Sequence, residues 1–198
     1  MDFTKSQVLE EFARQDRSYR LAILTTHWLR DTAPFKPSAT HEARGLHMKA
    51  GADWISFADL AEVLEKQETR DAAVSDFTLN QLHALLRAPF EVLNAYCESY
   101  DSRQTGSHLV SVLKCADWYE FARLIRNAVS HNFRFDFRKY DKSLMPLSWG
   151  GVTLTAELDG TPLTYESFWH KTGYELFLAM RAFSEAMPEI SHDARSDR

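Results

Sequence analysis

Apolar residues recur every three to four positions over several stretches of this chain, a spacing that places them on one face of a helix. We expect helices at about residues 5–30, in a short segment after Ser56, at about 78–100, at about 107–131 with a break near Ala116, and at about 164–187. The pattern therefore predicts a mainly α-helical protein.

Two capping signals and a proline refine these helices. Ser56 with Asp59 and Thr78 with Gln81 have the spacing of a capping box, so each pair is expected to start a helix. Pro89 lies inside the second of these helices. It is expected to kink or split that helix, because proline lacks a backbone N–H.

Turns and short strands are expected between the helices. Residues 31–53 hold two prolines and two glycines and predict a long loop. Strict alternation at residues 133–138 and the run Val152-Thr153-Leu154-Thr155 predict strands, and Asp159-Gly160 predicts a turn. We therefore expect a small β-hairpin elaboration at about residues 133–162, before the last helix.

The composition is that of a folded domain. Of the 198 residues, 44% are hydrophobic, which is enough for one domain with its own core. We expect a single helical domain over residues 1–190 and a disordered polar tail at residues 191–198.

Several classes of protein are disfavoured. No run of about 18 apolar residues predicts a membrane span, and the charged stretch after Met1 lacks the apolar core of a signal peptide. Cys97 and Cys115 form no CxxC pair and are expected to be buried thiols in a reducing compartment. His41 and His47 lack the HExxH spacing of a zinc site, and no phosphate-loop motif occurs. We expect a soluble cytoplasmic protein with no metal and no cofactor.

Charge is unevenly distributed along the chain. Residues 123–142 contain six Lys or Arg and two Asp, a net charge of +4, whereas the whole chain carries −5 and the remainder therefore −9. Phe133, Phe135, Phe137 and Tyr140 are interleaved with the basic residues. Cations beside aromatic rings are typical of a surface that binds single-stranded nucleic acid. The same alternation fits a strand that buries its phenylalanines and exposes its charges, and the two interpretations are compatible.

The helix that ends near residue 131 carries the most specific signal. At about 100° per residue, its polar and apolar side chains fall on opposite halves. The polar half holds Arg123, Arg126, Asn127, Ser130 and His131, and it is expected to carry no acid. Arginine neutralises a phosphate, and histidine transfers a proton near neutral pH. This combination is suited to phosphodiester chemistry.

The segment Arg126-Asn127-Ala128-Val129-Ser130-His131 resembles the Arg-x4–6-His motif of the HEPN superfamily, at its four-residue spacing. The resemblance covers roughly residues 5–133. It implies a HEPN-like helical bundle, dimerisation through the motif face and, often, metal-independent endoribonuclease activity of toxin or defence type. The implied partners are RNA, a second copy of the chain, and an antitoxin or nucleotidyltransferase.

We hypothesise a composite site at a homodimer interface, since one chain offers one motif arginine and one motif histidine. The expected catalytic residues are Arg126, Asn127 and His131. The expected RNA contacts are Arg123, Ser130, Arg134, Arg138 and Lys139.

Two other interpretations remain open. The chain is either a non-catalytic HEPN-like module that binds RNA or a protein through the same face, or an unrelated helical interaction domain in which the motif is a coincidence. The acidic balance outside residues 123–142 favours these two interpretations. An acid-free motif face favours the ribonuclease and the binding module.

Overall fold

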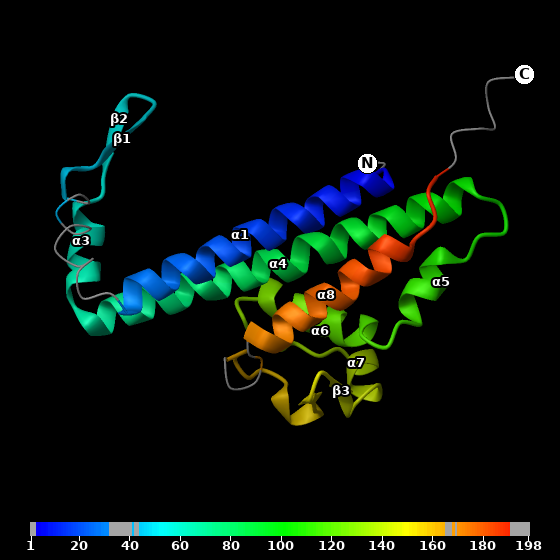
Figure 1. Cartoon of the computed structure of the whole chain (residues 1–198). Helices are drawn as coiled ribbons and strands as arrows, with labels where there is room; N and C mark the ends of the chain where they lie inside the picture. Colours follow the sequence, from blue (N-terminus) through cyan, green and yellow to red (C-terminus); the bar gives the residue numbers. More distant parts are fainter. Residues whose placement is uncertain (1–2, 32–40, 42–43, 165–167, 169, 191–198) are drawn as a thin grey trace, which may run out of the picture. The chain divides into compact units, whose positions relative to one another are not determined.

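The computed structural model describes residues 3–31, 41, 44–164, 168 and 170–190. The protein is mainly helical, with two short antiparallel hairpins, one of them before the last helix (Figure 1), which confirms the predicted fold class. The elements are α1 (Lys5–Asp31), β1 (His47–Ala50), β2 (Asp53–Ser56), α3 (Ala58–Glu65), α4 (Gln67–Arg103), α5 (Leu109–Lys114), α6 (Tyr119–Ser130), α7 (Lys139–Ser143), β3 (Leu147–Trp149), β4 (Val152–Leu154), the 3-10 turn η1 (Ala156–Leu158) and α8 (His170–Ala186). No described helix is both long enough and apolar enough to cross a membrane.

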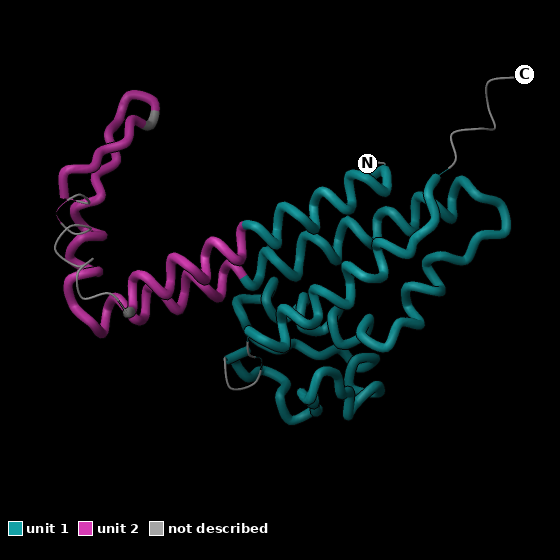
Figure 2. Tube along the Cα trace, in the orientation of Figure 1, with its two compact units in different colours: residues 1–17, 82–198 teal, residues 18–81 magenta. Residues whose placement is uncertain are grey.

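The chain divides into two units (Figure 2). Unit 1 comprises residues 1–17 and 82–198, and unit 2 comprises residues 18–81. Helices α1 and α4 each contribute residues to both units. That residues 1–190 form one domain stays a prediction, and the predicted polar tail lies outside the described residues.

Unit 1 is a bundle built around α4, α6, α8 and the first turns of α1. The rings of Phe12 on α1 and Phe177 on α8 lie 5.4 Å apart between centroids. Gly173 brings α8 close to α4, because a Cβ atom there would lie 2.6 Å from Cδ1 of Leu82. Close approach of this kind gives the core the tight packing expected of a protein interior.

The apolar half of α6 is buried, as the sequence predicts. Its buried side chains include Phe121, Leu124, Ile125, Ala128 and Val129. The ring of Phe121 contacts Trp149 of β3 at 6.0 Å between centroids and Phe168, before α8, at 6.2 Å. Burying a large apolar side chain stabilises a fold by about 1.5–3 kcal/mol. This face therefore anchors α6 and turns its polar half outward.

The hairpin before the last helix is formed by β3 and β4 and is shorter than predicted. Its turn is Gly150-Gly151, with φ values of 55° and 80°. Two positive φ angles are what the type I′ turn of a tight hairpin requires. The predicted strand at 152–155 is present as β4 (Val152–Leu154).

The prediction of a strand at residues 133–138 is wrong. Asn132 and Phe133 both have a φ of 54°, which interrupts the extended backbone, and a single bridge joins Arg134 to Pro162. Phe135 and Phe137 are nevertheless buried. The alternation in the sequence thus reported burial correctly, although the segment pairs too little to be a strand.

Helix α4 differs from its prediction at the expected cap, Thr78, and at the expected kink, Pro89. It begins at Gln67, and Thr78 lies in its interior, where its hydroxyl donates to the carbonyl of Val74 at 2.6 Å instead of capping a helix start. Pro89 does not split the helix. Leu85 and Leu93 on either side of the proline are fully buried, and this packing offsets the lost hydrogen bond.

The other helix boundaries lie close to their predicted positions, with one exception. Helix α3 begins at Ala58, close to the predicted start, but its N-cap is Phe57 and the predicted capping box of Ser56 and Asp59 is not formed. The hydroxyl of Ser56 accepts the N–H of Ala58 at 3.2 Å. The break near Ala116 separates α5 from α6, as expected. Helix α8 begins at His170, later than the predicted residue 164.

Unit 2 contains a hairpin that the sequence pattern did not predict. Strands β1 and β2 pair with Met48 opposite Ile55 and Lys49 opposite Trp54, inside and after the predicted loop at 31–53. Residues 32–40 and 42–43 of that loop lie outside the described residues. Trp54 is 66% exposed. Because this strand buries neither face, its sequence does not alternate between apolar and polar residues, and the hairpin could not be inferred from such a pattern.

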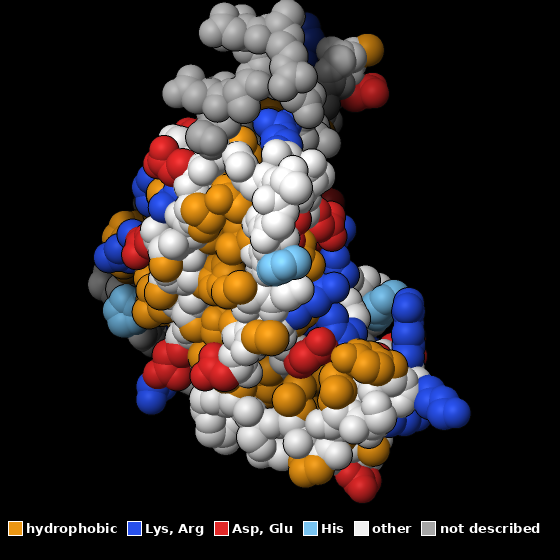
Figure 3. All heavy atoms as spheres, turned by 90° about the vertical axis from the view of Figure 1, so that its right-hand side faces the viewer, with side chains coloured by type: hydrophobic (Ala, Val, Ile, Leu, Met, Phe, Trp, Pro, Cys, Tyr) orange, Lys and Arg blue, Asp and Glu red, His pale blue; other side chains and the backbone are white. Residues whose placement is uncertain are grey.

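The two cysteines have different environments. Cys97 on α4 is buried, and burial raises the pKa of its thiol to about 12. Cys115 is exposed, so the prediction of two buried thiols is wrong for this residue. It lies just after α5, and with Val112 and Phe183 it lines an apolar hollow of about 530 Å³. Hydrophobic side chains gather in a band flanked by charged ones on the face shown in Figure 3.

Helix α5 is capped from α4 by Asp101. Its carboxylate accepts the hydroxyl of Ser107 at 2.6 Å and the N–H groups of Leu109 and Val110 at 2.7 and 2.9 Å. Burial alone would raise the pKa of Asp101, but these hydrogen bonds outweigh it and bring the pKa below its ordinary value of 3.8.

Candidate functional site

The polar half of α6 is directed outward, as predicted. Arg123, Arg126 and Asn127 are half-buried, whereas Ser130 and His131 are exposed. His131 is the C-cap of the helix, and its N–H donates to the carbonyls of Asn127 and Ala128 at 3.0 and 3.1 Å. The helix therefore holds these side chains on one rigid element.

The expectation of an acid-free face is wrong, because Glu120 also lies on the polar half of α6. It is three residues before Arg123, a spacing that makes side chains neighbours on a helix, and its carboxylate accepts Nε of Arg123 at 2.7 Å. Glu120 belongs to the first turn of α6, ahead of the motif residues.

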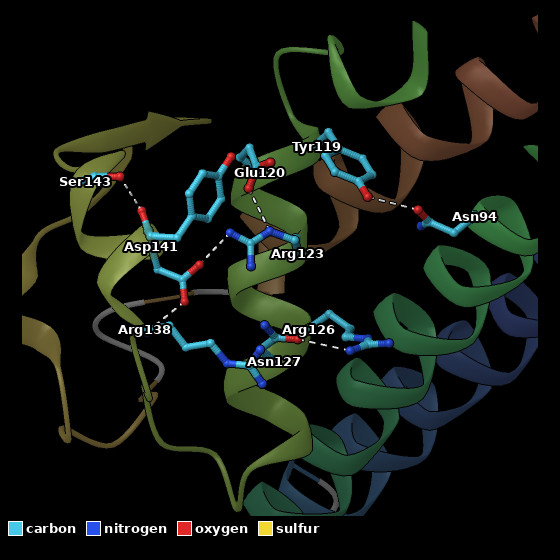
Figure 4. A network of polar contacts seen from close by, with 10 residues as sticks. Asn94, Tyr119, Glu120, Arg123, Arg126, Asn127, Arg138, Asp141 and Ser143 are labelled. Atoms are coloured by element: carbon cyan, nitrogen blue, oxygen red, sulfur yellow. Dashed lines mark hydrogen bonds and ion pairs between the residues drawn. The ribbon is translucent and has the colours of Figure 1, made fainter. Parts of the chain in front are cut away.

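Arg123 is held by a second carboxylate, that of Asp141 on α7. Nη2 of Arg123 donates to Oδ1 of Asp141 at 2.6 Å, and Oδ2 of Asp141 accepts the N–H of Arg138 at 2.9 Å (Figure 4). Partial burial lowers the pKa of Arg123, but the hydrogen bonds to Asp141 and Glu120 outweigh it and raise the pKa above its ordinary value. Arg123 thus joins α6 to α7, and its predicted RNA contact stays a prediction.

Arg126 points away from Arg123, toward α4 (Figure 4). Its Nη1 donates to Oδ1 of Asn127 at 3.0 Å, and its Nη2 lies 3.2 Å from Oε1 of Glu91. Its guanidinium carbon lies 5.9 Å from the centre of the Phe90 ring. The third nitrogen of the guanidinium, Nε, is buried and has no hydrogen-bond partner among the described residues.

A groove of about 450 Å³ lies between α4 and α6. Its lining includes Arg126 and Asn127 from the motif, Glu91 and Asn94 from α4, and Arg138 from the segment before α7. The volume falls within the range of small-ligand sites. The structure therefore brings two of the three predicted catalytic residues into one concave surface.

His131, the third predicted catalytic residue, does not line this groove. On the helix it lies about 140° from Arg126, so the two side chains diverge within one chain. Asn127 lies between them in angle and contacts Arg126.

Three of the predicted RNA contacts follow α6 in the chain. Arg134, Arg138 and Lys139 are all exposed. Nη2 of Arg134 donates to the carbonyl of Gly160 at 2.6 Å, which partly fixes its position. Arg138 alone of these three lines the groove.

Glu91 of α4 lines the groove and was not singled out from the sequence, and neither was His83 of the same helix, which does not line the groove. Glu91 accepts Nε of Arg87 at 2.9 Å as well as facing Arg126. His83, two turns earlier, lies edge-on to the ring of Phe133 at 5.9 Å between centroids. Burial and then the charge of Arg87 lower its pKa against the opposing effect of Glu91. The spacing of 83, 87 and 91 on one helix face was the available signal.

Comparison with known proteins does not identify a function for this site. No family model, curated protein or solved structure matches the chain. Within the part of the chain that the structure describes, no group of three or more His, Cys, Asp or Glu side chains is placed to hold a metal ion. The function is therefore argued from the side chains themselves.

Proposed function

We propose that this protein is a HEPN-like, metal-independent endoribonuclease that acts as a homodimer, in the manner of a toxin or defence factor. The single observation that carries the proposal is the arrangement on α6. Arg126 and Asn127 line a groove, and exposed His131 follows one turn later on the same rigid helix.

The proposed reaction uses the 2′-hydroxyl of the RNA as the nucleophile. A base takes the 2′-hydroxyl proton, the oxygen attacks the adjacent phosphorus, and the 5′-oxygen leaves with a proton from an acid. The products are a 2′,3′-cyclic phosphate and a 5′-hydroxyl. His131 transfers protons, Arg126 neutralises the charge that develops on the phosphorane, and Asn127 orients Arg126.

The directions of the side chains support the proposed dimer. Because His131 and Arg126 lie about 140° apart on α6, one chain does not aim both at one phosphate. A two-fold pairing of the α6 faces would present His131 of one chain beside Arg126 of the other. An antitoxin or a nucleotidyltransferase would then act by covering this face.

Two substitutions test the proposal. We expect His131→Ala and Arg126→Ala each to abolish RNA cleavage while leaving a folded dimer, as judged by circular dichroism and sedimentation. Wild-type cleavage by either variant would contradict the assigned roles. A monomeric parent that cleaves RNA would contradict the composite site.

A second function is favoured by one observation, the pairing of Arg123 and Arg126 with carboxylates within the chain. Arg123 contacts two carboxylates and Arg126 contacts Glu91, so neither carries an uncompensated charge. A non-catalytic module that binds RNA through the same face would keep these pairs. Binding of RNA without cleavage, unaffected by His131→Ala, would identify this second function.

A further inference from the structure

The starting observation is the unpaired Nε of Arg126. Buried donors in folded proteins are nearly always hydrogen-bonded, so each exception needs an explanation. Two donors of this guanidinium have partners, Asn127 and Glu91, whereas Nε has none among the described residues. Arg126 lines the groove and its side chain is 32% exposed, so an anion in the groove can contact the guanidinium once Glu91 releases it, and the freed side chain can then turn Nε toward the same acceptor.

Glu91 is the group that an incoming anion would replace. Its Oε1 lies 2.9 Å from Nε of Arg87 and 3.2 Å from Nη2 of Arg126, so one oxygen serves two cations. The contact with Arg126 is the longer of the two. Glu91 can release Arg126 and keep Arg87, so displacement leaves no unpaired carboxylate.

Three arginines line the groove, and Arg138 is the one to consider next, because Arg123 is held by Glu120 and Asp141. Its backbone N–H is bound by Asp141, but no carboxylate contacts its guanidinium among the described residues. Figure 4 shows its side chain lying beside Asn127. Arg138 also belongs to the basic segment of residues 123–142, with a net charge of +4. The groove thus opens beside cations that suit a chain of phosphates.

We infer that the groove between α4 and α6 binds a backbone phosphate of single-stranded RNA through Arg126 and Arg138, with Glu91 as the carboxylate that the phosphate displaces. The inference rests on the proposed function for its choice of RNA. Glu91 weakens the binding of any anion, because the anion has to compete with it. The bound phosphate is therefore released more readily than it would be without Glu91.

The test uses a fluorescent single-stranded RNA with 2′-O-methyl groups, which binds but is not cleaved. Its affinity is measured by fluorescence anisotropy for the parent, Arg138→Ala and Glu91→Gln. Arg14→Ala is the matched control, because it removes one arginine from α1 at a residue that does not line the groove. Inorganic phosphate serves as a competitor, to separate phosphate binding from base contacts.

We expect Arg138→Ala to weaken binding about tenfold, the effect of one hydrogen bond to a charged group, and to reduce the dependence on salt concentration. Glu91→Gln is expected to tighten binding about threefold, since a half-exposed ion pair competes with the phosphate. Inorganic phosphate should compete less well against RNA on Arg138→Ala than on the parent.

Binding by Arg138→Ala equal to that by Arg14→Ala would overturn the inference, and so would weaker binding by folded Glu91→Gln. Because Arg138 is exposed, its variant tests the groove even if Glu91→Gln does not fold. The probe is not cleaved, so the two proposals fail separately. If the parent cleaves no RNA but its binding is weakened by Arg138→Ala, the inference is supported and the proposed nuclease is contradicted. If the parent cleaves RNA but Arg138→Ala leaves binding unchanged, the nuclease is supported and the inference is contradicted.

Discussion

The carboxylate of Asp141 is expected to be one of the largest single polar contributions to the stability of unit 1. It is 2% exposed, and it joins α6 to the start of α7 by accepting from Arg123 and from the N–H of Arg138. Asp141→Ala removes both contacts and leaves Arg123 with Glu120 alone.

The size of the effect follows from these two contacts. A hydrogen bond to a charged group contributes about 1.5–3 kcal/mol, and loss of a helix cap costs about 1 kcal/mol. We expect Asp141→Ala to lower the free energy of unfolding by about 3 kcal/mol, within the range for breaking a buried ion pair. For a chain of this length that corresponds to a fall in Tm of about 6–12 °C.

Urea denaturation followed by circular dichroism and tryptophan fluorescence measures this loss. The matched control is Arg181→Ala, which breaks the exposed Arg181–Glu185 pair on α8 and should cost less than about 0.5 kcal/mol. Arg123→Met combined with Asp141→Ala should destabilise by less than the sum of the single changes. A loss for Asp141→Ala no larger than that of the control, or strict additivity in the double variant, would refute the reasoning.

Three further predictions concern other parts of unit 1. With iodoacetamide near pH 8, we expect exposed Cys115 to react in the folded protein. Cys97 should react only after unfolding, because it is buried and its pKa is raised to about 12. Mass spectrometry measures both reactions, and equal labelling of the two thiols in the folded protein would contradict this prediction. The lowered pKa of Asp101 stabilises the fold at pH values above its ordinary 3.8, and this stability is lost as the pH falls through the lower folded-state value. Asp101→Ala should therefore lose less stability than the parent between about pH 5 and pH 2, and parallel curves in acid would argue against the cap. Gly173→Ala should lower Tm, because the new Cβ would lie 2.6 Å from Cδ1 of Leu82. This clash is expected to outweigh the preference of alanine for helices. A raised Tm would contradict the prediction and show that α8 can shift.

The parts of the fold that follow from local periodicity could be predicted from the sequence. Helix α1 and the burial pattern of α6 are examples, because one side of each helix packs on the core and leaves a regular spacing. The cap predicted at Thr78 was wrong because burial of α4 continues through that residue. Tertiary packing there outweighs a local signal.

The site divides in the same way. The sequence placed Arg126, Asn127 and His131 on the polar half of one helix, and the structure leaves that half outside the core. The partners of the arginines come from elsewhere in the chain, and Glu91 and Asp141 were not foreseen. Their proximity depends on how α4 and α7 pack on α6, which a single helix does not encode.

Incubation of RNA with the purified protein in EDTA tests the central claim most directly, with His131→Ala alongside and the product ends analysed. The account predicts cleavage by the parent alone, leaving 2′,3′-cyclic phosphate and 5′-hydroxyl ends, because the 2′-hydroxyl is the nucleophile and His131 transfers its proton. No cleavage by the folded parent, or equal cleavage by His131→Ala, would contradict it.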